Sequence, residues 1–131
     1  MPRIESVPKG RHGVYLDRAK EFARQMDRAA TEKAWSSVGL LAVHSVISAC
    51  DALTVHQTGR RWSGQGHAGV VGVVGSLNLP DSDNALPQIS NALEKKNQVE
   101  YESRPFTERE SEDPRRTATR ILKWVTVRLS E

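Results

Sequence analysis

The chain contains 131 residues, of which 37% are hydrophobic and 27% charged, and its 19 Lys and Arg residues exceed its 16 Asp and Glu residues to give a formal charge of +3. This length is enough for one domain that buries a sizeable core without disulfides or metal, and the small positive charge favours anionic partners without being a nucleic-acid signature. The single cysteine, Cys50, excludes an intramolecular disulfide and favours a reducing compartment.

The first residues predict a flexible arm followed by an amphipathic helix. Residues 1–13 carry Pro2, Pro8 and Gly10, show no apolar period and lack the hydrophobic segment of a secretory signal, so we assign them to an arm and expect a cytoplasmic protein. From residue 14 to residue 31, apolar positions recur every three or four residues with charges between them, which predicts a helix that buries one face. We expect a single domain over residues 14–131.

The stretch over residues 34–57 predicts a buried central helix. It contains one formal charge, Asp51, and no proline, and a helix that is apolar on all sides belongs in the interior. A membrane span is the alternative, but His44, Asp51 and four serines are too many polar groups for the roughly 20 mostly apolar residues that a span requires. We therefore expect the core of a soluble bundle without membrane contact.

The next segments are an arginine- and glycine-rich stretch and a valine-rich stretch. Residues 58–67, TGRRWSGQGH, predict a loop. The valines of residues 68–75 favour a strand, while the glycines among them weaken either kind of element. Because no second strand is evident to pair with it, we predict a helix over residues 67–78, followed by a shorter helix over residues 86–98.

Two competing signals mark the start of the last helix. Thr107 and Glu110 have the spacing of a capping box, whereas Asp113 followed by Pro114 is an equally good N-cap and first-turn pair. Because Pro114 would disrupt a helix that begins at residue 107, we predict a short turn and then a helix over residues 114–130. The expected fold is all-α, an up-and-down bundle of four to five helices.

A glycine pattern follows the central helix. Gly64, Gly66 and Gly69 match the dinucleotide-binding fingerprint, whose glycines bring the backbone close to a pyrophosphate. That fingerprint requires a preceding strand within a βαβ unit, whereas here a long apolar helix precedes it. We therefore reject this interpretation.

A polar stripe crosses the central helix at His44, Ser48 and Asp51. Asp51 lies roughly 10 Å along the helix axis from His44, too far to orient its ring in a catalytic triad. We interpret the stripe as internal hydrogen bonding, although these residues, with Tyr101, could also line a pocket. The four histidines and the lone cysteine show no metal-ligand spacing, so we expect no metal and no cofactor.

Three residues of the predicted loop could act on a phosphodiester. Arg60 and Arg61 are candidates for phosphate binding, and Arg61 with His67 for catalysis, because a guanidinium can bind phosphate through two donors and an imidazole can transfer protons near neutral pH. The alternative is a solvated arginine pair and a histidine that caps the next helix. The residues alone leave both interpretations open.

The order of the segments resembles the HEPN domains of prokaryotes, in particular small stand-alone actinobacterial-type members. The resemblance rests on AVHSVISACDAL, then GRRWSGQGH, a short helix, LEKKNQVEYESRPFT and a final amphipathic helix. It implies an all-α bundle of four or five helices, usually dimeric and often paired with a nucleotidyltransferase in toxin–antitoxin or defence systems. Active members are metal-independent endoribonucleases that carry Arg, four to six residues and then His, a spacing that both Arg60 and Arg61 have to His67.

Three functions are compatible with this resemblance. Active members commonly carry a polar residue after the arginine, where this chain has Trp62, and other branches bind nucleotides or are inactive partners. The hypotheses are a metal-independent endoribonuclease, a nucleotide- or RNA-binding protein without activity, and a structural dimerisation module for a protein such as a nucleotidyltransferase antitoxin. We also expect a homodimer, because Trp62, Val70 and Val71 are apolar residues that a core of this size could leave uncovered.

Overall fold

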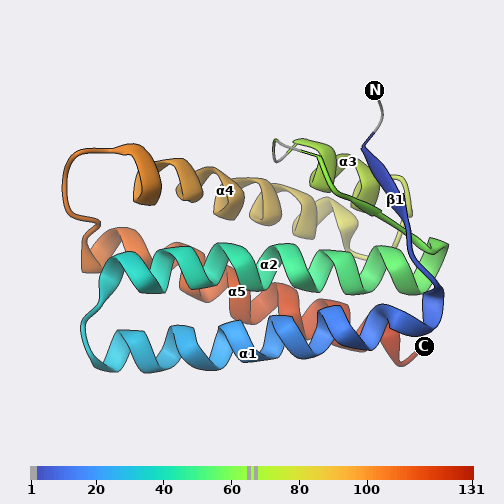
Figure 1. The fold of residues 1–131 in the computed structure, drawn as a ribbon, viewed down its shortest axis with the longest axis horizontal. Helices are drawn as coiled ribbons and strands as arrows, with labels where there is room; N and C mark the ends of the chain where they lie inside the picture. The colour runs from blue at the N-terminus through green and yellow to red at the C-terminus, as the bar shows by residue number, and fades with distance from the viewer. Residues whose placement is uncertain (1–2, 65, 67) are drawn as a thin grey trace.

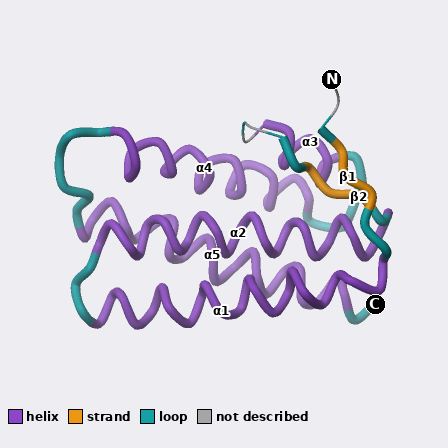
Figure 2. The backbone as a smooth tube through the Cα atoms, in the orientation of Figure 1, coloured by secondary structure: helices purple, strands orange, loops and turns teal. Residues whose placement is uncertain are grey.

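Four long helices run in alternating directions along the molecule, and a short helix and two short strands lie together at one end (Figures 1 and 2). This computed structural model describes residues 3–64, 66 and 68–131. The elements in chain order are β1 (Ile4–Ser6), the 3-10 turn η1 (Lys9–Arg11), α1 (His12–Thr31), α2 (Trp35–Thr58), β2 (Arg60–Trp62), α3 (Ala68–Gly75), α4 (Ser82–Tyr101) and α5 (Glu108–Leu129). The predicted helical bundle is present, with a two-stranded sheet that was not predicted.

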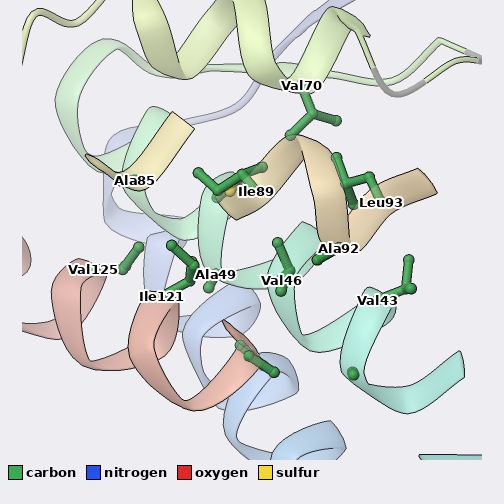
Figure 3. Close-up of a cluster of buried hydrophobic side chains, with 14 of the residues drawn as sticks. Val43, Val46, Ala49, Val70, Ala85, Ile89, Ala92, Leu93, Ile121 and Val125 are labelled. Carbon is green, nitrogen blue, oxygen red and sulfur yellow. The ribbon is translucent and has the colours of Figure 1, made fainter. Parts of the chain in front are cut away.

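The core forms around α2, as its lack of charge predicts. Its buried residues run from Val38 to Val55, and it contacts α1, α3, α4 and α5. Figure 3 shows side chains of α2, α4 and α5 meeting in one cluster that includes Val43, Val46, Ala49, Ala85, Ile89, Leu93, Ile121 and Val125. By length and composition α2 could cross a membrane, but in this structure most of its apolar surface is covered by its neighbours.

The valine-rich segment is a helix, α3, as predicted. Val70 and Val74 lie one turn apart, so they share a face, and both are buried. Trp62 and Val71 also pack against this core. The apolar residues that motivated the homodimer are therefore largely covered within the chain, and the homodimer itself stays a prediction without that support.

The N-terminal segment and the segment after α2 differ from the predictions of an arm and a loop. β1 and β2 pair antiparallel, with Glu5 opposite Arg61. Gly59 allows the chain to turn back from α2 into β2, because its φ of +70° ends the helix in the left-handed conformation that favours glycine. A Cβ at this position would also lie 3.2 Å from the carbonyl oxygen of Val7. A three-residue strand has no visible alternation, and its partner lies far away in the sequence, so neither strand was evident.

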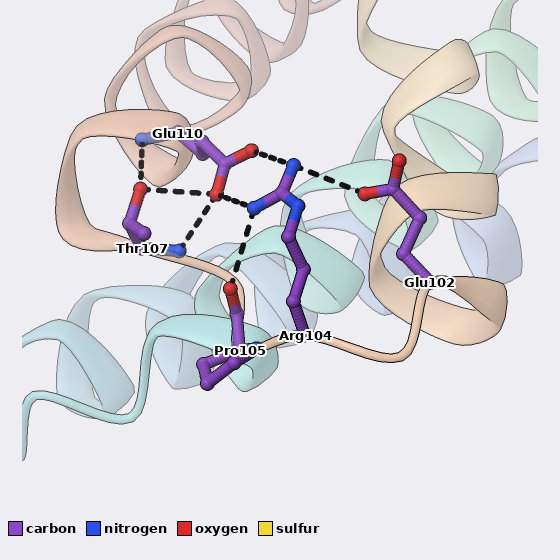
Figure 4. A network of polar contacts seen from close by, with 5 residues as sticks. All are labelled: Glu102, Arg104, Pro105, Thr107 and Glu110. Atoms are coloured by element: carbon purple, nitrogen blue, oxygen red, sulfur yellow. Dashed lines mark hydrogen bonds and ion pairs between the residues drawn. The ribbon is translucent and has the colours of Figure 1, made fainter.

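The last helix starts before Pro114, so the predicted start was wrong. The Thr107 hydroxyl accepts a hydrogen bond from the Glu110 backbone N–H at 3.1 Å, and the Glu110 carboxylate accepts one from the Thr107 N–H at 3.0 Å, which completes the capping box. Arg104 donates to both oxygens of Glu110 and pairs with Glu102 (Figure 4). These bonds, with Arg104 contributing most, lower the pKa of Glu110 to about 2. The cap fixes the start of α5, and Pro114 is buried inside the helix.

Helix α4 is also longer than predicted at both ends, since Ser82–Tyr101 replaces the expected residues 86–98. Pro87 lies inside the helix, in its second turn, where it lacks the N–H that would otherwise donate to the Asp83 carbonyl oxygen. The extension matters for the site, because it places Tyr101 on the last turn of the helix, beyond the predicted end at residue 98.

Candidate functional site

Arg61 connects three elements at the end of the bundle that carries the sheet. Its Nη1 donates to Oε2 of Glu5 on β1 at 2.6 Å, and its Nη2 donates to Oδ2 of Asp51 on α2 at 3.1 Å. Its guanidinium carbon lies 5.3 Å from the centroid of the Tyr15 ring of α1, within cation–π range. Because β2 follows α2 directly through Gly59, the chain turns back over its own helix and brings Arg61 onto Asp51. The guanidinium is thus held in one orientation.

Asp51 is an ionisable group in the interior, with 4% of the residue exposed. Burial raises the pKa of Asp51 to about 6, and this effect outweighs the attraction of Arg61 and Arg18, while Glu5 raises the pKa further. For Arg61, burial alone would lower the pKa, but Asp51 and Glu5 outweigh burial and raise it. The Asp51–Arg61 pair is therefore ionised at neutral pH and loses its negative partner in mild acid.

Arg61 also lines an open cleft between the segment after β2 and the C-terminal part of α4. The cleft has a volume of about 500 Å³, within the range of small-ligand sites. We call it the Arg61 cleft, and its lining residues are Ile47, Arg61, Trp62, Ser63, Gly64, Gly66, Val70, Lys96, Asn97 and Tyr101. Tyr101 is 76% exposed, although large aromatic side chains are usually well covered. Two cations, two aromatic rings and an amide therefore border one volume.

The glycine pattern, which was rejected as a dinucleotide fingerprint, seats the Trp62 indole. The indole Nε1 donates to the Gly66 carbonyl oxygen at 3.1 Å, and Gly66 adopts a φ of +92°. A Cβ at Gly64 would lie 2.6 Å from an indole carbon, and one at Gly69 would overlap the ring. The glycines let the backbone approach the indole, so packing accounts for them without a phosphate.

The structure does not bring Arg60 and Arg61 together on one phosphate site. Neighbouring residues of a strand point to opposite faces. Arg61 lines its cleft, whereas Arg60 lines a separate hollow with Ile4, Thr58, Val73 and Ser76. His67, the second candidate catalytic residue, lies outside the described residues, so its pairing with Arg61 stays a prediction.

The polar stripe of α2 does not act as one unit. Asp51 pairs with Arg61, and Ser48 is buried. His44 is half-buried, and its pKa is lowered by burial and by the charge of Lys96. Of the predicted pocket residues, Tyr101 lines the Arg61 cleft. Asp51 does not line it but binds Arg61, which does. His44 and Ser48 are not among the described lining residues of the cleft.

Sequence reasoning missed Glu5, Lys96 and Asn97. Asn97 and Tyr101 are one helical turn apart and Lys96 adjoins them, so the pattern KNQVEY could have indicated a polar helix face beside an aromatic ring. Glu5 gave no local signal, because its role depends on strand pairing. Within residues 3–64, 66 and 68–131, no group of three or more His, Cys, Asp or Glu side chains could hold a metal.

Comparison with known proteins found no matching family model, no matching curated protein and no matching solved structure.

Proposed function

We propose that this chain is an HEPN-like helical bundle that binds RNA or a nucleotide in the Arg61 cleft. The observation that carries the proposal is the exposed Tyr101 beside Lys96, in the same cleft as Trp62 and Arg61. Ammonium and guanidinium groups bind phosphate, and aromatic rings stack on bases, so these side chains match both halves of a nucleotide.

The arrangement of the helices supports the HEPN-like part of the proposal. Four long helices alternate in direction, and the short helix α3 follows the central helix after the arginine-rich segment (Figure 1). This is the order on which the resemblance rests. A homodimer and a nucleotidyltransferase partner are further expectations of the resemblance and stay predictions.

The side chains that line the cleft have different roles in the proposed binding. The Lys96 ammonium is 3.9 Å from Glu100, a long ion pair, so it is available to a phosphate. Arg61 is already bound by two carboxylates, so it supplies a fixed charge at the wall rather than a bidentate clamp. Asn97 offers an amide to a base edge, and Tyr101 offers a ring face.

Fluorescence anisotropy with a labelled short oligoribonucleotide tests the proposal. Tyr101→Ala should weaken binding by roughly 5- to 100-fold, the range for loss of one stacked base, and Lys96→Ala should weaken it and reduce its salt dependence. Lys95→Ala is the matched control, because it removes the same charge from the same helix but lines a different hollow against α5. Equal losses for Lys95→Ala and Lys96→Ala, or no binding by the unmodified protein, would contradict the proposal.

A second candidate function is metal-independent cleavage of RNA. It is favoured by the position of Arg61 in the cleft, at the start of the segment that leads to His67. In this reaction His67 accepts the proton of a ribose 2′-hydroxyl and the 2′-oxygen attacks the phosphorus. The bond to the 5′-oxygen breaks as that oxygen takes a proton from water, and His67 then releases its proton to solvent. The positive charge of Arg61 stabilises the phosphate oxygens during attack, and a 2′,3′-cyclic phosphate results.

The nuclease candidate is tested with RNA in EDTA, using the unmodified protein and His67→Ala. Cleavage that disappears in His67→Ala while oligonucleotide binding persists would support it. Binding without cleavage in both proteins would leave the binding function and remove the nuclease, and cleavage that persists in His67→Ala would exclude His67 as the base.

A further inference from the structure

Glu5 occupies one side of the guanidinium that borders the proposed binding cleft. Its Oε2 accepts from Arg61 Nη1 at 2.6 Å, closer than Asp51 at 3.1 Å, although half of the Glu5 side chain is exposed. The sheet register places Glu5 directly opposite Arg61, a position in which opposite charges attract across two strands. One arginine of the cleft is therefore held by two carboxylates.

Carboxylates pair with both cations among the described residues that line the cleft. Asp51 is largely ionised at neutral pH, since its pKa is about 6. Arg61 is paired with Glu5 and Asp51, and the Lys96 ammonium lies 3.9 Å from Glu100. The two cations are therefore opposed by three carboxylates.

We propose that Glu5 is a specificity-determining residue of the Arg61 cleft, which limits the number of negative charges that the site accepts. The inference rests on the proposed function. A phosphodiester or a monophosphate needs little more than the Lys96 ammonium, whereas a di- or triphosphate brings further charges to a site with no surplus of cations. The site therefore does not favour polyphosphates over nucleic-acid phosphodiesters and monophosphates.

Glu5, rather than Asp51, is the residue through which this limit can be changed. Asp51 is buried and holds Arg61 from inside the bundle, so its removal alters the interior. Glu5 lies on a surface strand that is also held by backbone bonds on both sides, from Val7 N–H to Gly59 O and from Ser63 N–H to Arg3 O, each at 2.8 Å. Removing the Glu5 charge should leave the strand in place.

The test compares AMP, ADP and ATP by calorimetric titration at low ionic strength in EDTA. In the unmodified protein the three affinities should lie within about threefold of one another, because added phosphates gain nothing at a site with no surplus of cations. In Glu5→Gln the affinity for ATP should rise roughly tenfold relative to AMP. Asp27→Asn is the matched control, because it removes a carboxylate that pairs with Arg115 between α1 and α5 and lines a different hollow.

Two further variants keep the test decisive. Glu5→Asp retains the charge, so it should keep the ratios of the unmodified protein, and Glu5→Ala removes it and replaces Glu5→Gln if that variant does not fold. The inference would be overturned if folded Glu5→Gln or Glu5→Ala had the same ratio of ATP to AMP affinity as the unmodified protein, or if the unmodified protein strongly preferred ATP. Either result would leave the proposed function standing. Absence of binding by any nucleotide or oligonucleotide would overturn both.

Discussion

Replacing Asp51 with Asn should remove a pH-dependent step from the stability of the fold. Asp51 has a pKa of about 6 in the folded chain, against an ordinary value of 3.8, because burial outweighs the attraction of Arg61. The folded state therefore binds this proton more tightly than the unfolded state does. The contribution of Asp51 to stability is fully present below about pH 4 and is lost as the pH rises through 6.

The size of the step follows from the shift in pKa. A difference of about 2 units corresponds to about 3 kcal/mol, since one unit is about 1.4 kcal/mol. Asn has nearly the shape of the neutral acid and does not titrate, so the variant lacks the step. His44 has a lowered pKa, so its own contribution rises with pH over part of this range and would mask the step in a single curve. The difference between the two proteins removes that contribution.

Urea unfolding followed by circular dichroism, at pH values from 3.5 to 7.5, measures this difference. The free energy of unfolding of the unmodified protein minus that of Asp51→Asn should fall by about 3 kcal/mol across the range. Asp113→Asn, at a position where 80% of the side chain is exposed, is the control and should show no such fall. A difference that is constant, or that increases with pH, would mean that the pairing with Arg61 outweighs burial and would refute the reasoning.

Three further predictions concern packing and capping. Gly69→Ala should displace the Trp62 indole, lower the free energy of unfolding by roughly 1–3 kcal/mol and shift the tryptophan emission. Gly72→Ala is the control: its added methyl meets nothing within 4 Å, so it should be neutral or stabilising by about 1 kcal/mol. Equal effects of the two substitutions would contradict the packing of the indole against Gly69. Thr107→Ala should cost about 1 kcal/mol in urea unfolding through loss of the cap, and a cost near zero would contradict its role. Cys50 is 1% exposed and burial raises its pKa, so it should react with a thiol reagent only as the protein unfolds; prompt reaction of the native protein would contradict its burial.

The helices could be predicted because their signals are local. The single charge of residues 34–57 identified α2 as the core helix. Because no second strand was evident, the valine-rich segment was predicted to be helical, and residues 68–75 form a helix. The start of α5 could not be predicted in the same way. Thr107 and Pro114 gave competing signals, and only the structure shows that the capping box sets the start while the helix accommodates Pro114 in its second turn.

The candidate site was less predictable because pairing between distant segments builds it. Arg61 was identified from the sequence, but its partners Glu5 and Asp51 reach it from β1 and α2. The two adjacent arginines looked equivalent in a loop and became different once they lay in a strand, where one faces the cleft and the other does not. Tyr101 was a candidate from the sequence, whereas its neighbour Lys96 was identified only in the structure.

The proposal that RNA or a nucleotide occupies the Arg61 cleft can be tested by an ¹H–¹⁵N spectrum titrated with a short oligoribonucleotide. The indole N–H signals serve as built-in probes, because Trp62 lines the cleft whereas Trp124 donates to the Pro80 carbonyl oxygen at 3.1 Å elsewhere. Binding in the cleft predicts that the Trp62 indole signal and the amides of Lys96 and Tyr101 shift together while the Trp124 signal stays in place. Shifts at Trp124 without shifts at Trp62, or no shifts at all, would contradict the proposal.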